Sequence, residues 1–173
     1  MKKTLFSTML LISAVSFSAS ANAQEYAFNK SLVTAVNPYP EKETRIVVET
    51  EVNINAVRDF SKNFKNATSV KWVKNENGAS VYFVADGVKM RSSYNTKGKR
   101  EYILKYYDES RLPANIRHLV RSTYYDYRIA IVTEVERNEE TSYLVKMEND
   151  KEFLTIKVDD GELSVFEKTT KGK

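Results

Sequence analysis

The stretch that decides the fold is residues 69–107, SVKWVKNENGASVYFVADGVKMRSSYNTKGKREYILKYY. Its apolar and polar residues alternate, as in half-buried strands, and turn dipeptides interrupt it three times. The turns are Asn77-Gly78, Asp86-Gly87 and Lys97-Gly98. Because Asn-Gly and Asp-Gly tolerate the positive φ angles of tight hairpin turns, the stretch predicts four antiparallel strands in a meander.

A short helix is expected directly before these strands. Val57, Phe60 and Phe64 recur at the spacing of one helical face, and Asn53 and Asn55 are candidate N-caps. We therefore expect the three apolar side chains to pack on the sheet.

The same order of elements recurs in the second half of the chain. Leu112-Pro113 opens a second helical segment, and strand-like runs follow at 128–136, 142–148, 152–158 and 162–168. The expected apolar face of this helix carries Ile116, Leu119, Val120 and Thr123. Matching Val57 with Ile116, Tyr82 with Tyr143 and Gly98 with Gly161 gives offsets of 59, 61 and 63, which indicates a diverged duplication. On the two helices, Val57, Phe60 and Phe64 are expected to match Ile116, Leu119 or Val120, and Thr123 in facing the sheet. Independent convergence on the same element order is the alternative.

These patterns predict an α+β fold. It is a tandem repeat of a helix plus a four-stranded antiparallel meander, forming one eight-stranded sheet with two helices on one face. The expected segments are a signal peptide at 1–23, a flexible lead-in at 24–52, a first repeat at 53–108 and a second repeat at 109–173. Within the lead-in, residues 45–52 are expected either to pair at a sheet edge or to be extended.

Alternation assigns the second repeat's side chains to the two faces of the sheet. The residues expected to meet the helices are Ile129, Ile131 and Val135, then Tyr143, Val145 and Met147, then Leu154, Ile156 and Val158. The opposite face then carries Ala130, Val132, Leu144, Phe153 and Phe166 among lysines. That face is more apolar than a solvated one needs to be. We therefore predict that Leu144, Phe153, Phe166, Lys146 and Lys157 contact a partner.

Aromatic residues are in surplus, with 11 Tyr and 8 Phe. Six tyrosines cluster between the two halves, interleaved with arginines: Tyr102, Tyr106, Tyr107, Tyr124, Tyr125 and Tyr127. Tyr and Arg suit an interface, and they equally suit a seam where two repeats pack. Tyr124 is assigned to this seam, whereas Trp72 is assigned to the core with Val57, Phe60 and Phe64.

The N-terminus has the pattern of a secretory signal. Lys2 and Lys3 precede a mostly apolar stretch at 5–17, and Ala21-Asn22-Ala23 is a cleavage site before Gln24. An uncleaved anchor is the weaker alternative, because the stretch is shorter than the ~20 residues that span a bilayer. The mature protein is expected in the periplasm or outside the cell, with no stable membrane insertion.

The composition argues against several functions. The formal charge is +4, and removal of Lys2 and Lys3 leaves 25 basic and 23 acidic residues, or +2, which is small for a nucleic-acid-binding protein. There is no cysteine, and the single histidine, His118, is expected on the solvent side of its helix. We therefore expect no cofactor, no metal and no enzymatic triad. The Asp159-Asp160-Gly161-Glu162 segment is expected to be a turn rather than a calcium site.

The residues resemble the PepSY-like family of β-lactamase-inhibitor-like (BLIP-like) periplasmic proteins. The matching features, in order, are Phe60-x-x-x-Phe64, Val70-x-Trp72, the 81–84 strand, Tyr94 before Gly98, Leu112-Pro113 and Tyr143-Leu144-Val145. They extend over about residues 57–166, with Phe64-Lys65 where the family has Phe-Pro. The resemblance implies the tandem unit and a curved sheet whose exposed face can bind another protein. Inhibition of a β-lactamase is not carried over, because no residue here matches the inhibitors' acidic turn.

Three hypotheses on function follow. The leading one is a non-enzymatic, exported binding module that holds a protein or peptide partner on the open sheet face, with inhibition as one form of that binding. The second is a structural envelope protein that self-associates through its sheet. The third is an enzyme that uses carboxylates alone.

Overall fold

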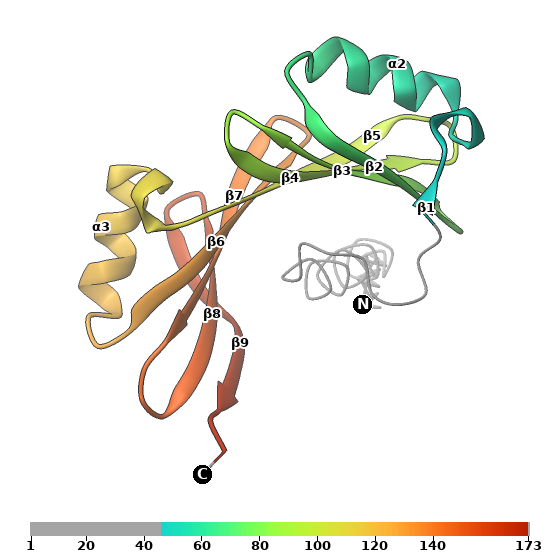
Figure 1. The fold of residues 1–173 in the computed structure, drawn as a ribbon. Coiled ribbons are helices and arrows are strands. Elements are labelled where there is room, and N and C mark those ends of the chain that lie inside the picture. The colour runs from blue at the N-terminus through green and yellow to red at the C-terminus, as the bar shows by residue number, and fades with distance from the viewer. Residues whose placement is uncertain (1–45, 173) are drawn as a thin grey trace, which may run out of the picture. The chain divides into compact units, whose positions relative to one another are not determined.

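The computed structural model describes residues 46–172, which Figure 1 shows in colour. The predicted signal peptide and most of the predicted lead-in lie outside the described residues. The elements are, in chain order, β1 (Ile46–Val47), η1 (Glu49–Glu51), α2 (Ile54–Asn63), β2 (Thr68–Asn75), β3 (Gly78–Ala85), β4 (Val88–Asn95), β5 (Arg100–Tyr107), η2 (Glu109–Arg111), α3 (Ala114–Thr123), β6 (Arg128–Arg137), β7 (Glu140–Glu148), β8 (Glu152–Asp159) and β9 (Glu162–Thr170).

The strands form one antiparallel sheet whose spatial order, β1 to β9, is the order of the chain. The predicted α+β fold class is confirmed: η1, α2 and β2–β5 are followed by η2, α3 and β6–β9, which we call the first and second repeats. β1 is an additional edge strand of two residues, paired with Val73 and Trp72 of β2. Of the two alternatives for residues 45–52, edge pairing is therefore right for Ile46–Val47, and the 3-10 helix η1 follows.

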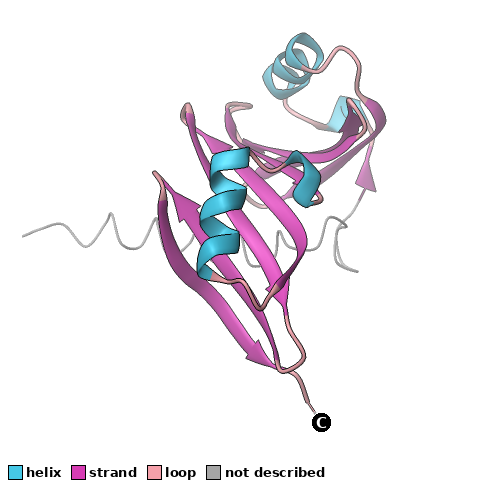
Figure 2. Cartoon of the chain, turned by 90° about the vertical axis from the view of Figure 1, so that its left-hand side faces the viewer, coloured by secondary structure: helices cyan, strands magenta, loops and turns pink. Residues whose placement is uncertain are grey.

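Both helices lie on the same face of the sheet. Val81 of β3 is opposite Ser92, and Ser92 is opposite Ile103 of β5. Tyr107, four residues after Ile103 and on the same face, is opposite Val132 of β6. Val81 belongs to the cluster under α2 and Val132 to the cluster under α3. Figure 2 shows α3 lying across the strands of its own repeat.

Aromatic side chains fill the core of the first repeat. The ring of Phe60 is 5.0 Å from that of Phe83 and 5.5 Å from that of Trp72, and both pairs are edge-to-face. Phe60 and Trp72 are buried, whereas Val57 and Phe64 pack at the margin of the same cluster. Edge-to-face pairs add to the free energy gained by burial, so α2 is held mainly through Phe60.

The two helices end in the same way, and this corrects the predicted match between them. α2 is closed by Phe64, whose N–H donates to the Phe60 carbonyl, and α3 by Tyr124, whose N–H donates to the Val120 carbonyl, each over 2.9 Å. Phe60 therefore corresponds to Val120 and Phe64 to Tyr124, sixty residues apart. The matches of Phe64 with Thr123 and of Val57 with Ile116 were each wrong by one residue. Thr123 lies one position before the residue that closes α3 and is exposed, and Ile116 corresponds to the buried Ala56.

The match of Tyr82 with Tyr143 was also wrong. Tyr82 is the residue after Val81 in β3, so its side chain lies on the face away from the helices. Tyr143 packs against the cluster under α3. The two tyrosines thus belong to opposite faces.

A β-bulge reverses part of the predicted face assignment in β6. Ile129 pairs with Met147, but the next pair is Ile131 with Lys146, so β6 carries one extra residue. Because the extra residue shifts the period-two alternation, Val132 faces the helices while Ile131 and Val135 lie on the other face. The predictions for these three residues were wrong, and those for the helix-facing residues of β7 and β8 agree with the pairing.

The tight turns use the backbone conformations that their residues allow. Asp86 and Gly87 have φ of 51° and 73°, the two positive values of a type I′ turn. Gly78 has φ of +140°, and a Cβ there would lie 2.1 Å from the carbonyl oxygen of Tyr94 on β4. Glycine is therefore required at the start of β3 by both its φ and its neighbour.

Candidate functional site

The face of the sheet opposite α2 and α3, called the helix-free face from here on, is the candidate site. Two rows of directly opposed residues cross it from strand to strand. One row is Tyr82, Arg91, Leu104, Val135 and Ser142, on β3 to β7. The other is Tyr106, Thr133, Leu144 and Lys157, on β5 to β8. Neither row contributes to the two clusters that pack under the helices.

Four of the five residues predicted to contact a partner lie together on this face. Leu144 is opposite Lys157, and Lys146 follows on the same side of β7. The ammonium of Lys146 is 6.0 Å from the centre of the Phe153 ring, which is 39% exposed. Phe166 has no directly opposed partner on β8, because the register shifts between Thr155 and Ile156. The pairing therefore does not assign Phe166 to the helix-free face.

Leu144 differs from expectation in one respect: it is 2% exposed. It sits in a central strand between Thr133 and Lys157, and side chains on both sides shield such a position from solvent. Leu144 is therefore part of the floor of the helix-free face rather than an exposed anchor. Leu104 and Val135 are likewise buried.

A second group on this face was missed by the sequence analysis. Arg91 lies directly opposite Tyr82 on β3 and Leu104 on β5. Tyr102 and Tyr106 flank Leu104 at two residues on either side, so both are diagonal neighbours of Arg91. The guanidinium carbon of Arg91 is 5.5 Å from the centre of the Tyr82 ring. Extending the alternation to β4 and β5 would have assigned these side chains to one face, but their position opposite one another depends on the register of the three strands.

Burial and electrostatics distinguish this group. Burial raises the pKa of Tyr106 and of Tyr82, while the positive charge of Arg91 acts in the opposite direction. Both hydroxyls are therefore neutral over the physiological range and available as hydrogen-bond donors. Arg91 donates from Nη2 to the Ser80 hydroxyl over 3.3 Å.

The helix-covered face carries a polar network of its own near the β5–β6 pairing. Lys105 donates to Glu134 over 2.8 Å and also to Glu136, and the Tyr107 hydroxyl donates to Glu134. Burial alone would raise the pKa of Glu134, but the hydrogen bonds from Lys105 and Tyr107 outweigh it, and the pKa is lowered. The network joins β5 to β6 and so ties the two repeats together.

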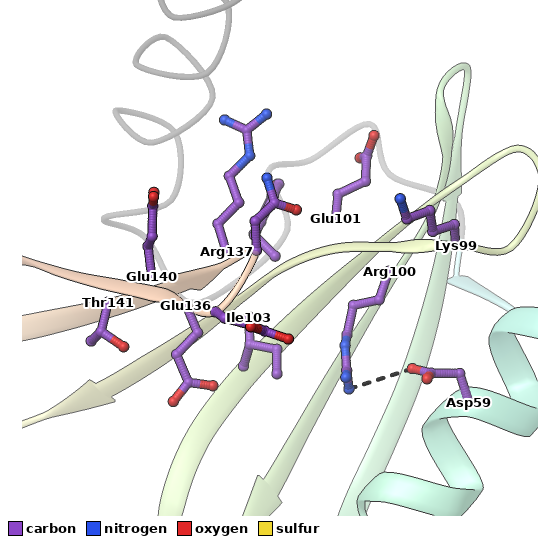
Figure 3. Close-up of a pocket in the computed structure, with 12 residues that line it drawn as sticks. Asp59, Lys99, Arg100, Glu101, Ile103, Glu136, Arg137, Glu140 and Thr141 are labelled. Atoms are coloured by element: carbon purple, nitrogen blue, oxygen red, sulfur yellow. Dashed lines mark ion pairs between the residues drawn. The ribbon is translucent and has the colours of Figure 1, made fainter.

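A polar pocket of about 570 Å³ lies beside this network (Figure 3). Its lining comes from α2, β5 and the β6–β7 hairpin, and it mixes Lys99, Arg100 and Arg137 with five carboxylates. Arg100 is 3.4 Å from Asp59, and Glu136 is held by Lys105. Two of the five carboxylates, Asp59 and Glu136, are thus ion-paired within the protein, so the pocket contains part of an ion-pair region.

The tyrosines between the two halves do not form one cluster. Tyr102, Tyr106 and Tyr107 lie on β5, the strand at the seam. Tyr124 instead packs within the second repeat, with its ring 6.0 Å from that of Tyr127, and Tyr125 is 84% exposed. The seam assignment of Tyr124 was therefore wrong, because the α3–β6 connection lies over the strands of its own repeat.

Other candidate chemistry is sparse. His118 is exposed on α3, as its helical position predicts. Within residues 46–172, no three His, Cys, Asp or Glu residues are placed to hold a metal ion. Asp160 and Gly161 form the turn between β8 and β9, with φ of 45° and 78°. In the described part of the chain, no helix has the length and apolar character needed to cross a bilayer.

Comparison with solved structures shows the same fold in Bacteroides proteins. A BLIP-like protein from Bacteroides fragilis is 16% identical, with a TM-score of 0.59 over 70% of this chain and 89% of that chain. A DUF2874 family protein from Bacteroides ovatus is 18% identical, with a TM-score of 0.58 over 67% and 85%. A protein from Bacteroides eggerthii described as periplasmic is 14% identical, with a TM-score of 0.58 over 69% and 88%.

At these identities the likeness is one of fold. No family model matches the sequence, and no curated protein matches it. The structural likeness supports the BLIP-like resemblance, while its PepSY-like part stays a prediction.

Proposed function

We propose that this is an exported, non-enzymatic binding protein that holds a protein partner on its helix-free face. One observation carries the proposal. Both helices cover one face of the sheet, while the other presents tyrosine, arginine and lysine side chains over an apolar floor that includes Leu104 and Leu144. Tyrosine and arginine are the residues that interfaces favour, because each combines a large contact area with a polar end.

Export is the second part of the proposal. It rests on the signal pattern before Gln24 and is supported by the fold shared with a protein described as periplasmic. Under this proposal the bound partner can be an enzyme that is inhibited by the binding. The only support for inhibition is that one protein with the same fold is described as BLIP-like.

Self-association is the second candidate function, because the sheet has an open edge. No described strand pairs with the outer edge of β9, and none of the nine residues of β9 is buried. Unpaired backbone groups along such an edge can pair with a strand of another chain.

Site-specific photocrosslinking distinguishes these functions. A photoreactive phenylalanine analogue replaces Phe153 on the helix-free face, Val165 on β9, or Tyr125 as an exposed control away from both. In cells, the binding proposal predicts a crosslink to a different protein from position 153 and none from position 125. A crosslinked dimer from position 165, with nothing from 153, would favour self-association. No crosslink from position 153 would overturn the binding proposal.

A further inference from the structure

Among the described arginines, Arg91 is the one that has a buried side-chain nitrogen without a hydrogen-bond partner. Arg100 has a carboxylate partner in Asp59, and Arg121 has one in Glu109. Among the described residues, Arg91 has no carboxylate within ion-pair distance. Its Nε atom is buried and donates to no acceptor.

The hydroxyl of Tyr106 is a second buried polar group without a hydrogen-bond partner. Tyr106 itself is 6% exposed. It interacts electrostatically with Arg91 and with Tyr82. Buried polar groups in proteins are nearly always hydrogen-bonded, so two unpartnered donors at one place indicate a missing acceptor. A carboxylate suits both, because its two oxygens accept several bonds and match a guanidinium.

The charges around Arg91 favour an acidic occupant. The side chains on the middle of the helix-free face include the basic residues Lys146 and Lys157, and two of its acidic residues, Glu148 and Asp159, lie at strand ends and are already paired. Glu148 binds Lys171 over 2.9 Å, and Asp159 binds Lys157 over 2.6 Å. Among the described residues, no carboxylate forms an ion pair with Arg91.

We propose that Arg91, flanked by Tyr82 and Tyr106, binds the side-chain carboxylate of an aspartate or glutamate in an acidic segment of a protein partner. The inference rests on the proposed function and names the chemistry of the partner. Arg91 supplies a charged, planar donor, Tyr106 supplies a neutral hydroxyl donor, and the Tyr82 ring holds the guanidinium in place. Lys146 meets a further acidic residue along the segment.

The test uses the exported form of the protein, which begins at Gln24 under the proposal, and two ten-residue probe peptides with capped ends. One alternates glutamate with threonine, and the other has glutamine in place of each glutamate. Binding is followed through the side-chain Nε–H resonance of Arg91 and by calorimetry. We expect the glutamate peptide to shift this resonance and the glutamine peptide to bind at least about tenfold more weakly. Free acetate at the same carboxylate concentration is expected to cause little shift, because it lacks the further contact to Lys146.

Matched variants complete the test. Arg91→Gln should weaken the glutamate peptide by about tenfold or more, Arg91→Lys by less, and Tyr106→Phe by several-fold. Arg58→Gln, an exposed arginine on α2, removes the same charge and should change binding less than about twofold. Thermal melts check that each variant is folded.

Three results would overturn the inference. These are equal binding of the two peptides, equal losses in Arg91→Gln and Arg58→Gln, and no binding of the glutamate peptide up to about 1 mM. Acetate shifting the Arg91 resonance as strongly as the peptide would assign the site to small anions instead. Because the crosslinking from Phe153 does not depend on Arg91, failure here with a crosslink there leaves the proposed function standing.

Discussion

Phe64 and Tyr124 occupy the same position in the two repeats. Each closes its helix with nearly the same backbone angles, φ −124° and ψ 59° for Phe64 and φ −121° and ψ 55° for Tyr124. Each ring packs beside its own repeat's core, Phe64 at 4.6 Å from Phe83 and Tyr124 at 6.0 Å from Tyr127. The aromatic ring at the end of the helix is thus a shared structural device of both repeats.

The first prediction compares two neighbouring tyrosines. Tyr124→Ala should lower the free energy of unfolding by about 2 kcal/mol, less than the ~3–5 for a fully buried aromatic residue because Tyr124 is partly exposed. Tyr125→Ala is the control, since its side chain is 84% exposed and surface changes stay within about 0.5 kcal/mol. Urea unfolding measures both, and equal effects would contradict the packing of Tyr124.

The second prediction concerns Phe60, the centre of the first core. Phe60→Ala should cost about 3–5 kcal/mol, because it removes a buried ring that contacts Trp72 and Phe83. Phe64→Ala should cost roughly half as much, since Phe64 is only partly buried. A larger loss for Phe64 than for Phe60 in denaturant melts would show that the core is centred elsewhere.

The third prediction separates two glycines in turns. Both have positive φ, +140° for Gly78 and +78° for Gly161, but a Cβ on Gly161 meets nothing within 4 Å. Gly161→Ala should therefore cost only the backbone strain of about 1–2 kcal/mol. Gly78→Ala adds an overlap with the Tyr94 carbonyl and should cost at least about 2 kcal/mol more. Similar melting temperatures for the two variants would be evidence against the β3–β4 register.

The fourth prediction follows from the network between β5 and β6. The pKa of Glu134 is lowered in the folded state, so its contribution is present above its unfolded pKa of about 4.3 and is lost as the pH falls through the folded value. Burial alone would lower the pKa of Lys105, but its bonds to Glu134 and Glu136 raise it. The Lys105 contribution is therefore present below about pH 10 and is lost above it.

Urea unfolding between pH 3 and 7 provides the measurement. Glu134→Gln should be less stable than the parent protein near pH 7, and the difference should shrink below about pH 4. Tyr107→Phe removes one donor to Glu134 and should show part of the same change. A difference that stays constant with pH would mean that Glu134 is not held as a carboxylate.

The fifth prediction concerns export. Intact-mass analysis of the protein from a periplasmic or secreted fraction should find Gln24, open or cyclised, as its first residue. Recovery of Met1 in membrane-bound material would contradict cleavage and, with it, a freely diffusing binding protein.

Local patterns sufficed for much of the fold. The dipeptides ending in Gly78 and Gly87 and the alternation between them fixed the strands, since tight turns require residues that accept positive φ. The spacing of Val57, Phe60 and Phe64 along one helical face predicted the helix α2. Local patterns did not suffice where one residue changes which side chains face the helices. The extra residue at Ala130 reverses the two faces of the sheet in β6. The apolar spacing of α3 likewise did not indicate that Tyr124 is the residue that closes the helix.

In the candidate site, too, the sequence predicted the features that lie within single strands but not those that depend on strand pairing. The surplus of apolar residues pointed to Phe153 and Lys146, because those signals lie within single strands. The group around Arg91 depends on the register of β3, β4 and β5 together, and a register is set by pairing rather than by composition. The burial of Leu144 likewise depends on its neighbours on two other strands.

The strands lie in the sheet in the same order as in the chain, and this order affects how the protein can fold during synthesis and export. A chain that emerges N-terminus first, from a ribosome or through an export channel, can add each strand to the one before it as soon as that strand appears. Such sequential pairing keeps contacting segments close in sequence, which favours rapid folding. It also shortens the time during which a nascent edge is open to aggregation. The first repeat can close over Phe60 before the second has emerged, and β9 is the last described strand to pair.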